Sequence, residues 1–436
     1  MTQINNHILA NHTDHLMEKV VERGNLKRAI EQVERNKGSA GVDNMQVKEL
    51  RPYLKENWDR IKQELLDGTY EPSPVRRVSI PKQDGGVREL GIPTVLDRFI
   101  QQAIQQVLTT IFEPIFSSNS YGFRPGKSAR QAVRKAQSYI QSGKKIVVDI
   151  DLEKFFDQVN HDPLMTKVAK HVSDKRIHKI IRKYLQSGVM LHGCCVATEK
   201  GTPQGGPISP LLSNIILNDL DSELTQRGHL FVRYADDCNI YVSSERAGQR
   251  VYASVTSFIE RRLKLKVNVQ KSAVDRPARR KFLGFSFTSC QKVKLRIASK
   301  AIIAFKNKIR SLTNRSWSIS VIERVKKLNE YLLGWGGYFC IIQVKSILQK
   351  LDEWIRRRLR MCLLKQWKRC KTKFANLVAR GITEEQAAYI AYSRKKYWRL
   401  SKTPQINKVF DLAYWREQGL INLIDRQNDM LLKMST

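Results

Sequence analysis

Two adjacent carboxylates, Asp236 and Asp237, interrupt a run of strand-forming residues at positions 231–242. Stretches rich in Val, Ile, Tyr and Phe on both sides of a short acidic segment predict two antiparallel strands joined by a tight turn, with both carboxylates at the turn. Adjacent anionic side chains repel each other, so a cation, a basic neighbour or water must offset the repulsion. Mg²⁺ suits such a place, because it takes a few carboxylates and fills its other positions with water and substrate phosphate. The alternative is a solvated Asp-Asp turn without a chemical role.

A second acidic strand end, at residues 144–157, favours the metal site. Side chains alternate along a strand, so Val147, Asp149 and Asp151 share one face. A buried strand rarely ends in unpaired carboxylates, because burying a charge without a partner is costly. Placed beside Asp236 and Asp237, this strand end predicts a cage of three carboxylates for two metal ions. Such a pair of ions can bridge the attacking and leaving oxygens of a phosphoryl transfer.

The composition indicates a polyanionic partner. The 436 residues include 77 Lys and Arg against 41 Asp and Glu, a net charge of +36. Proteins this basic usually bind nucleic acid, with an affinity that falls steeply with salt. A membrane surface is the competing polyanion, but the sequence has no apolar run of about 18 residues and its start does not resemble a secretory signal. Seven cysteines without a C-x-x-C pair favour reduced thiols in a cytosol over a zinc knuckle.

Two further elements precede the acidic strands. Apolar residues at three- and four-residue spacing predict helices over residues 16–66, with a break at 38–43. Residues 75–90 predict a β-hairpin with Asp-Gly-Gly at its turn. Lys82 and Arg88 on its two arms could clamp a polyphosphate, Lys as a point charge and Arg by its planar fork. A solvated basic hairpin is the alternative.

Two short motifs in these acidic segments resemble those of a known enzyme family. The Tyr-Ala-Asp-Asp segment at 234–237 resembles the Y-x-D-D box of reverse transcriptases, and Asp151 with Phe156 five residues later is similar to their first palm motif. This offset selects Asp151 over Asp149 as the expected metal ligand, and leaves open whether Asp149 is structural or a weak metal partner. In that family the aromatic residue lies under the sugar of the incoming nucleotide, which implies that Phe156 excludes a 2′-hydroxyl. A Phe that only packs in the core is the alternative.

The resemblance extends over several blocks in the right order. Residues 77–102, 120–126, 201–214 and 282–285 are similar to successive motifs of reverse transcriptases encoded by group II introns. In the third block, Gly205 and Gly206 would let the backbone approach a base pair closely. The resemblance implies catalytic Asp151, Asp236 and Asp237, with the backbone carbonyl of Leu152 as a further metal ligand. It also implies nucleotide-binding roles for Lys82, Arg88, Phe156, Gln204 and Lys271.

Beyond residue 296 the pattern is that of basic amphipathic helices. Apolar stripes at 302–312 and 348–359 run among Lys and Arg. A helix bundle with a solvated cationic face is one interpretation, and the functional one adds nucleic-acid phosphates along that face. Residues 331–339 resemble the maturase, or thumb, region of the intron family. Residues 389–425 mix cations with aromatics and look like its short DNA-binding domain, although a packed aromatic cluster would give the same pattern. The expected nucleic-acid contacts are Arg124, Arg356, Arg357, Arg360, Lys395, Lys396 and Arg399.

The predicted fold class is α+β. We expect a right-hand polymerase with fingers and palm, followed by a helical thumb and a small basic C-terminal domain. The expected segments are a helical extension at 1–70, fingers and palm at 71–295, thumb at 296–380 and the DNA-binding domain at 381–436. No His or Cys follows Gly419, so we expect the compact bacterial class that lacks an HNH endonuclease domain, acting in the bacterial cytosol as a ribonucleoprotein.

The predicted function is RNA-directed DNA synthesis. Two Mg²⁺ ions would serve the copying of an RNA template onto a DNA primer from deoxynucleoside triphosphates, and the chain would also bind its group II intron RNA to assist splicing and mobility. One alternative is an RNA-binding maturase with little polymerase activity. Another is a reverse transcriptase of a retron, a diversity-generating element or a CRISPR system, which the long maturase-like segment argues against.

Overall fold

The chain forms two compact units. The computed structural model describes residues 13–81, 86–191, 194–196, 200–202, 205–290 and 292–435, and its contacts divide the chain into Met1–Arg276 and Pro277–Thr436. The sequence analysis puts the corresponding limit at 295/296. The division at 276/277 has a physical reason, because the Phe285 ring packs against those of Tyr338 and Phe339, with ring centroids 5.4 and 5.1 Å apart. The functional limits at 70/71, 295/296 and 380/381 stay predictions.

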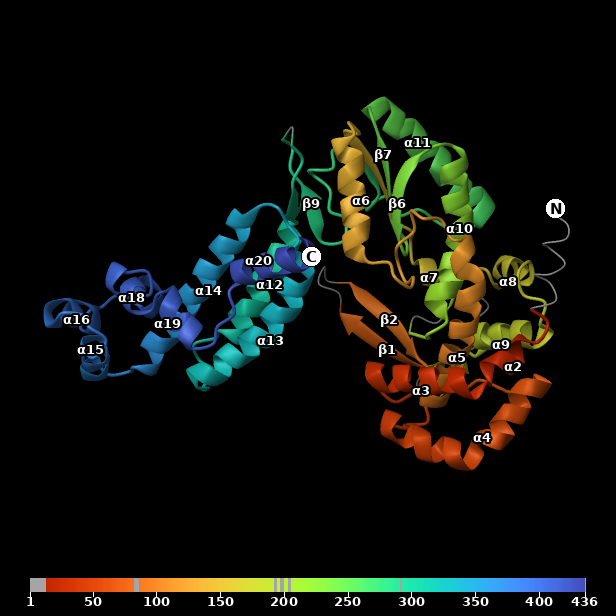
Figure 1. Ribbon diagram of the computed structural model, residues 1–436, viewed down its shortest axis with the longest axis horizontal. Helices are drawn as coiled ribbons and strands as arrows, with labels where there is room; N and C mark the ends of the chain where they lie inside the picture. Colours follow the sequence, from red (N-terminus) through yellow and green to blue (C-terminus); the bar gives the residue numbers. More distant parts are fainter. Residues whose placement is uncertain are drawn as a thin grey trace. The chain divides into compact units, whose positions relative to one another are not determined.

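The first unit is mainly helical (Figure 1). The predicted N-terminal helices are confirmed, and the segment between α3 and α4 contains three residues with positive φ, Lys37 (55°), Gly38 (99°) and Asn44 (60°). The helices of this unit are α2 (Leu16–Val20), α3 (Arg23–Asn36), α4 (Leu50–Asp67), α5 (Val95–Phe112), α6 (Ala129–Gln141), α7 (Phe155–Gln158), α8 (His161–Ala169), α9 (Lys175–Gln186), α10 (Ser209–Gln226) and α11 (Glu245–Phe258), with shorter helical segments η1 (Val47–Glu49), η2 (Glu113–Ile115) and η3 (Ile259–Leu263).

One sheet of this unit contains the predicted basic hairpin. Its strands are β1 (Val75–Pro81), β2 (Val87–Ile92), β4 (Val189–Leu191) and β5 (Cys194–Val196), in the order β2-β1-β4-β5. β1 and β2 are antiparallel, with Pro81 opposite Val87, so the hairpin is confirmed. Its turn, which includes Lys82, lies outside the described residues.

The other sheet contains both acidic strand ends. Its strands are β3 (Ile146–Ile150), β6 (Leu230–Tyr234), β7 (Asp237–Val242) and β8 (Ala273–Asp275), in the antiparallel order β6-β7-β3-β8. α11 packs on one face, where a Cβ on Gly248 would lie 3.2 Å from the Ile146 side chain. α6 packs on the other face, through Tyr139 against Tyr241 at 5.8 Å. Asp151 belongs to the face that α6 covers, because side chains alternate along β3.

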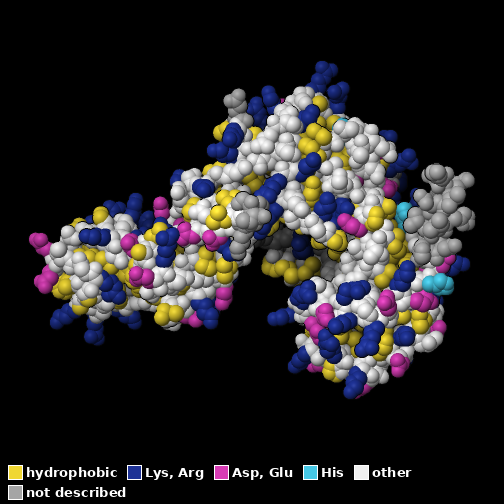
Figure 2. Space-filling model, viewed as in Figure 1, with side chains coloured by type: hydrophobic (Ala, Val, Ile, Leu, Met, Phe, Trp, Pro, Cys, Tyr) yellow, Lys and Arg dark blue, Asp and Glu magenta, His cyan; other side chains and the backbone are white. Residues whose placement is uncertain are grey.

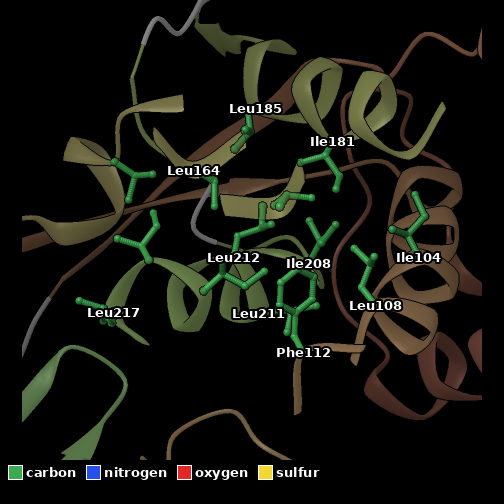
Figure 3. Packing of buried hydrophobic residues seen from close by; sticks show 14 of the residues in the cluster. Ile104, Leu108, Phe112, Leu164, Ile181, Leu185, Ile208, Leu211, Leu212 and Leu217 are labelled. Atoms are coloured by element: carbon green, nitrogen blue, oxygen red, sulfur yellow. The ribbon is translucent and has the colours of Figure 1, made fainter. Parts of the chain in front are cut away.

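A helical core supports the sheets. Figure 3 shows aliphatic side chains of α5, α8, α9 and α10 packed together, with Phe112 among them. Leu108, Ile181 and Leu217 are fully buried there, and each buried side chain of this size contributes about 1.5–3 kcal/mol. Helices and antiparallel strands thus share one unit, which confirms the predicted α+β class.

The second unit is helical apart from one hairpin. β9 (Phe285–Phe287) pairs with β10 (Leu295–Ile297). Its helices are α12 (Ser299–Leu312), α13 (Val321–Phe339), α14 (Lys345–Gln366), α15 (Cys370–Val378), α16 (Glu384–Ala391), α17 (Tyr397–Leu400), α18 (Pro404–Val409), α19 (Leu412–Glu417) and α20 (Leu423–Ser435). α20 packs on α13 and α14, so the C-terminal helices join the same compact unit. None of the helices that the structure describes is long and apolar enough to cross a bilayer.

One buried carboxyl group makes the second unit sensitive to pH. Asp352 of α14 accepts hydrogen bonds from the backbone N–H groups of Leu423 (3.0 Å) and Ile424 (3.2 Å). Burial nevertheless raises the pKa of Asp352 to about 6. The folded chain therefore holds this proton more tightly than the unfolded chain. The resulting stability is fully present below pH ~4 and is lost as the pH rises through ~6, by at most about 3 kcal/mol.

The variant Asp352→Asn keeps an acceptor for the two N–H groups but does not titrate. We expect its melting temperature to rise relative to that of the wild type as the pH increases from ~4 to ~7. Thermal unfolding of both chains across this range measures the difference. A difference that does not vary with pH would contradict the assignment.

Candidate active site

The two adjacent carboxylates lie at a hairpin turn, as predicted. Tyr234 pairs with Asp237, so Ala235 and Asp236 form a two-residue turn between β6 and β7. Ala235 has φ 56°, and two-residue hairpin turns that match the twist of their strands require positive φ. Asp236 is half-buried and Asp237 is exposed.

The third carboxylate follows the neighbouring strand at the same end of the sheet. Ile150 pairs with Cys238, so the next residue, Asp151, lies opposite Asp237 with its side chain on the same face. The backbone of Asp151 is anchored on its other side, where its N–H donates to Ser272 Oγ (3.0 Å) and its carbonyl accepts from the Asn268 N–H (2.8 Å). The structure therefore places Asp151, Asp236 and Asp237 at one end of this sheet.

Leu152 follows Asp151 at the same end of the sheet. Leu152 forms an isolated antiparallel bridge with Val267, and the flanking Glu153 N–H donates to Lys266 O (2.8 Å). Backbone groups of successive strand residues point to alternate sides. Because Asp151 and Glu153 bond toward residues 266–268, the carbonyl of Leu152 points toward β7.

These oxygens fit a divalent cation that also binds substrate phosphates. Among the described residues, no three His, Cys, Asp or Glu side chains are gathered closely enough to hold a metal ion by themselves. Mg²⁺ needs only one or two carboxylates when water and phosphate supply its remaining oxygens, and Asp151 opposite Asp237 meets that need. Lys271 Nζ lies 3.9 Å from Asp151 Oδ1, so a cation already offsets part of the carboxylate charge.

Asp149 differs from Asp151 in its surroundings. With the Asn239 amide oriented to satisfy both groups, its nitrogen donates to Asp149 Oδ1 (2.9 Å), and the two residues are paired across β3 and β7. Asp149 thus has a side-chain partner within the sheet, which favours a structural role for it.

A buried ion pair lies behind the turn, and the sequence analysis missed it. Arg233 and Asp221 are both 0% exposed and form a bidentate pair at 2.7 and 2.6 Å. Arg233 Nη1 also donates to Asn214 Oδ1 (3.0 Å) and to the Ala235 carbonyl (2.9 Å). The guanidinium therefore fixes the backbone of the turn that carries Asp236. The sequence did contain a signal for this pair: an Arg lies inside an apolar strand, and a buried charge needs a partner of opposite charge.

The blocks at 120–126 and 201–214 meet at this turn. A Cβ on Gly122 would lie 2.2 Å from the Ala235 nitrogen, so only glycine fits there. Asn214 Nδ2 donates to the Gly122 carbonyl (2.9 Å). Gly205 has φ 140° and a Cβ on it would lie 2.5 Å from the Gly91 carbonyl. Glycine is thus required at position 205 because the backbone there contacts β2. The close approach of this backbone to a base pair remains a prediction.

Phe156 lines a cavity of about 260 Å³ between the hairpin and α7. Arg77, Gly91 and Thr202 contribute to the same wall. Arg88 is exposed and pairs with Ile80, so it belongs to the hairpin face opposite to Arg77. The structure thus brings Phe156 to this cavity but not Arg88, while Lys82 and Gln204 lie outside the described residues.

Two predicted nucleic-acid contacts are contradicted by the structure. The Arg124 side chain is 5% exposed, pairs with Glu113 (2.8 Å) and donates to the carbonyls of Ser117 and Ser120. Its donors are thus used inside the protein. Arg360 is also buried and donates to the Phe410 carbonyl (3.4 Å), and burial lowers its pKa to about 10. Both side chains are structural, because their charged groups do not reach the surface.

The other predicted contacts are more accessible. Arg356 and Arg357 are half-buried, whereas Lys395, Lys396 and Arg399 are exposed. The Arg357 guanidinium lies 3.8 Å from the centre of the Trp398 ring, which leaves part of its edge for hydrogen bonds. By contrast, Trp415 is buried against Tyr414, so that part of the C-terminal pattern is a packed aromatic cluster.

The comparisons with known proteins agree with this geometry. Residues 80–287 match the family described as reverse transcriptase (RNA-dependent DNA polymerase), and residues 302–381 match the group II intron, maturase-specific domain. The chain is 33% identical to protein YkfC of Escherichia coli K12 over 272 residues, which is 54% of this chain and 71% of YkfC. It is 38% identical to the group II intron-encoded protein LtrA of Lactococcus lactis subsp. cremoris over 175 residues, 40% of this chain and 29% of LtrA.

The chain therefore belongs to the reverse transcriptases. Its second matched domain places it among the reverse transcriptase/maturase proteins encoded by group II introns, which confirms the family inferred from the sequence motifs. Members of this class use divalent metal ions and bind RNA. The match spans less than a third of LtrA.

Two solved structures resemble part of the chain. One is a partial Cas6-RT-Cas1–Cas2 complex, with 25% identity, a TM-score of 0.37, and coverage of 56% of this chain and 42% of the other. The second is an apo telomerase of Candida tropicalis, with 14% identity, a TM-score of 0.41, and coverage of 52% and 55%.

Proposed function

We propose that this chain synthesises DNA on an RNA template with Asp151, Asp236 and Asp237 as its catalytic carboxylates. The observation that supports this most is the pairing of β3 with β7, which puts Asp151 opposite Asp237 next to the turn that holds Asp236. Family membership supports the class of reaction, and the sheet register supports the choice of these three residues.

The metal we propose is Mg²⁺, as two ions. When bound, the ions lower the pKa of the primer 3′-hydroxyl and neutralise charge on the triphosphate. Asp151 and Asp237, with Asp236 at the adjoining turn and the Leu152 carbonyl, would hold them together with oxygens of water and substrate phosphate. The antiparallel pairing and the buried Arg233 keep these oxygens in place, so little reorganisation is needed during the reaction.

The nucleotide site we propose combines residues of the β1–β2 hairpin segment with residues that lie near the carboxylates in the sequence or in the structure. Lys82 and Arg88 would bind the triphosphate of a deoxynucleotide, and Gln204 and Phe156 would shape the space around its base and sugar. Lys271, beside Asp151, would exchange this partner for a phosphate oxygen as the substrate arrives. An exposed pair of this kind contributes about 1 kcal/mol or less, so exchanging it costs little.

The partners we propose are a DNA primer and the RNA of its own group II intron, in the bacterial cytosol. Lys and Arg side chains are spread over the visible surface (Figure 2), and the formal net charge is +36. The maturase-specific match at 302–381 supports a splicing role alongside synthesis. Lys395, Lys396 and Arg399 are the exposed cations that we assign to DNA contact.

Sugar selection provides a test of the role of Phe156. The variant Phe156→Ala removes the ring expected under the sugar, so a 2′-hydroxyl would be accommodated. We expect the preference for deoxynucleotides over ribonucleotides to fall by about 10–100-fold, measured as the ratio of kcat/KM for the two substrates. The variant Phe156→Tyr keeps the ring and should keep the preference. An unchanged ratio in Phe156→Ala would assign Phe156 to packing alone.

Primer extension tests the proposed function as a whole. We expect the purified chain to extend a DNA primer on an RNA template with deoxynucleotides and Mg²⁺, and to stop when the metal is chelated. If the chain binds RNA in a salt-sensitive way but makes no product, also in the presence of its intron RNA, the proposal is wrong. The second candidate, a maturase with a silent polymerase site, would then hold.

A further inference from the structure

A basic hollow of about 520 Å³ lies at the end of the β6-β7-β3-β8 sheet away from the carboxylates. It is lined by the segment before β3, the turn between α10 and β6, the end of β7, and α11. Ile146, at the start of β3, pairs with Val242 near the hollow, whereas Ile150 pairs with Cys238 near the carboxylates. At about 3.3 Å per residue, β3 separates the two ends by roughly 15 Å. The hollow is therefore distinct from the candidate active site.

The lining of this basic hollow carries positive charge only. Lys144, Arg227 and Arg250 line it, and no acidic side chain does among the described residues. Two of these cations hold hydroxyl groups in the wall: Lys144 Nζ donates to Ser243 Oγ and Arg227 Nη1 donates to Ser254 Oγ, each at 3.2 Å. The wall thus presents cations and hydroxyls from separate elements together.

The positive charge is only partly compensated by the protein. Arg227 pairs with Glu223 behind the wall (2.6 Å), but Lys144 and Arg250 form no ion pair within the part of the chain that the structure describes. His229 lines the same hollow, and burial together with the charge of Arg227 lowers its pKa. Cations gathered in this way repel one another. A bound anion would relieve the repulsion.

We propose that the basic hollow binds backbone phosphates of an RNA strand. Lys, Arg and hydroxyl groups are the side chains that most often contact nucleic-acid phosphates. Arg250, Ser243 and Ser254 are exposed, so a polymer can pass along the wall. The Tyr241 ring is buried, and the accessible polar groups of the wall are cations and hydroxyls, so we expect contacts to phosphates rather than to particular bases. This inference rests on the proposed RNA-binding function and extends it to a surface of the palm.

RNA held there would lie away from the reacting atoms. The basic hollow should therefore contribute to RNA affinity and to its salt dependence, and not to the rate of nucleotide addition on a short primer–template. A free nucleotide carries the same phosphate chemistry, so the test must separate the two ligands.

The test uses a double variant and a matched control in the full-length chain. Lys144→Gln with Arg250→Gln removes two cations from the hollow. Lys170→Gln with Lys175→Gln removes two exposed cations elsewhere in the same unit. Affinity for a primer-free RNA is measured over a salt series. We expect the slope of log affinity against log salt to become shallower by about 1.4 in the first variant, as for two lost phosphate contacts to a single strand, and to stay unchanged in the control. Extension of a short primer–template should be unchanged in both.

A local readout accompanies the binding curves. The pKa of His229, followed by NMR, should rise when RNA binds the wild type and should not rise in the Lys144→Gln/Arg250→Gln variant. Inorganic phosphate or a deoxynucleotide at equal phosphate concentration should leave the pKa unchanged. If the free nucleotide raises the pKa of His229 and RNA does not, or if the salt slope of the double variant equals that of the wild type, the inference is overturned. If the wild type binds no RNA, the proposed function fails as well.

Discussion

Asp236→Ala will abolish DNA synthesis and leave RNA binding nearly unchanged. Asp236 lies at the β6–β7 turn, next to the paired positions of Asp151 and Asp237. Bound metal ions stabilise the charge that develops in the transition state by several kcal/mol. Removing one of the carboxylates that would hold them should slow nucleotide addition by at least about 10³-fold. RNA affinity depends on the many Lys and Arg side chains of the surface, so it should change little.

The matched control for this variant is Asp59→Ala, which removes an exposed carboxylate on α4. It should synthesise DNA at the wild-type rate. Primer extension and RNA binding are measured on all three proteins under one salt condition. Synthesis by Asp236→Ala would refute the assignment of the carboxylates. A joint loss of RNA binding and synthesis would point instead to an unfolded chain, which the melting temperature reports.

Arg233→Leu is expected to have the second largest effect. Asp221 would remain fully buried without its bidentate partner, which costs about 3–5 kcal/mol. The Ala235 carbonyl would also lose its donor, so the turn that carries Asp236 would no longer be fixed. Thermal unfolding measures the first effect, and the Mg²⁺ concentration required for half-maximal synthesis measures the second.

A double variant separates stability from positioning. In Arg233→Leu/Asp221→Leu no buried charge is left unpaired, so much of the lost stability should return. Synthesis should not return, because the Ala235 carbonyl still lacks its donor. Arg233→Lys keeps a charge but loses the planar fork, and should raise the Mg²⁺ requirement with a smaller loss of stability. If synthesis recovers in step with stability in the double variant, Arg233 has only a structural role.

The sequence predicted much of the fold because its signals are local. The alternation of side chains in residues 146–151 predicted an acidic strand, and the two strand runs around Asp236 predicted a hairpin; the structure contains both. The hairpin of β1 and β2 followed in the same way from its Asp-Gly-Gly turn. Each of these patterns depends on residues within one short segment.

The burial of single charged residues was not predictable in this way. Arg124, Arg233 and Arg360 have the same side chain as the exposed Arg399, yet their partners are residues brought together by tertiary packing. Arg124 pairs with Glu113 and Arg233 with Asp221. Composition and spacing describe the charge of a segment, whereas the direction in which one guanidinium points depends on how its element packs against other elements. The same reason kept the buried Asp352 out of the sequence analysis.

Addition of a single deoxynucleotide to a DNA primer on an RNA template tests whether Asp151 and Asp237 serve in metal-dependent DNA synthesis. The measurement compares the wild type with Asp151→Asn and Asp237→Asn over a range of Mg²⁺ concentrations, at saturating primer–template. The predicted result is metal-dependent addition by the wild type and a rate at least about 10³-fold lower in each variant, with primer–template still bound. Addition by either variant at a rate near that of the wild type, or addition without a divalent metal, would contradict the account.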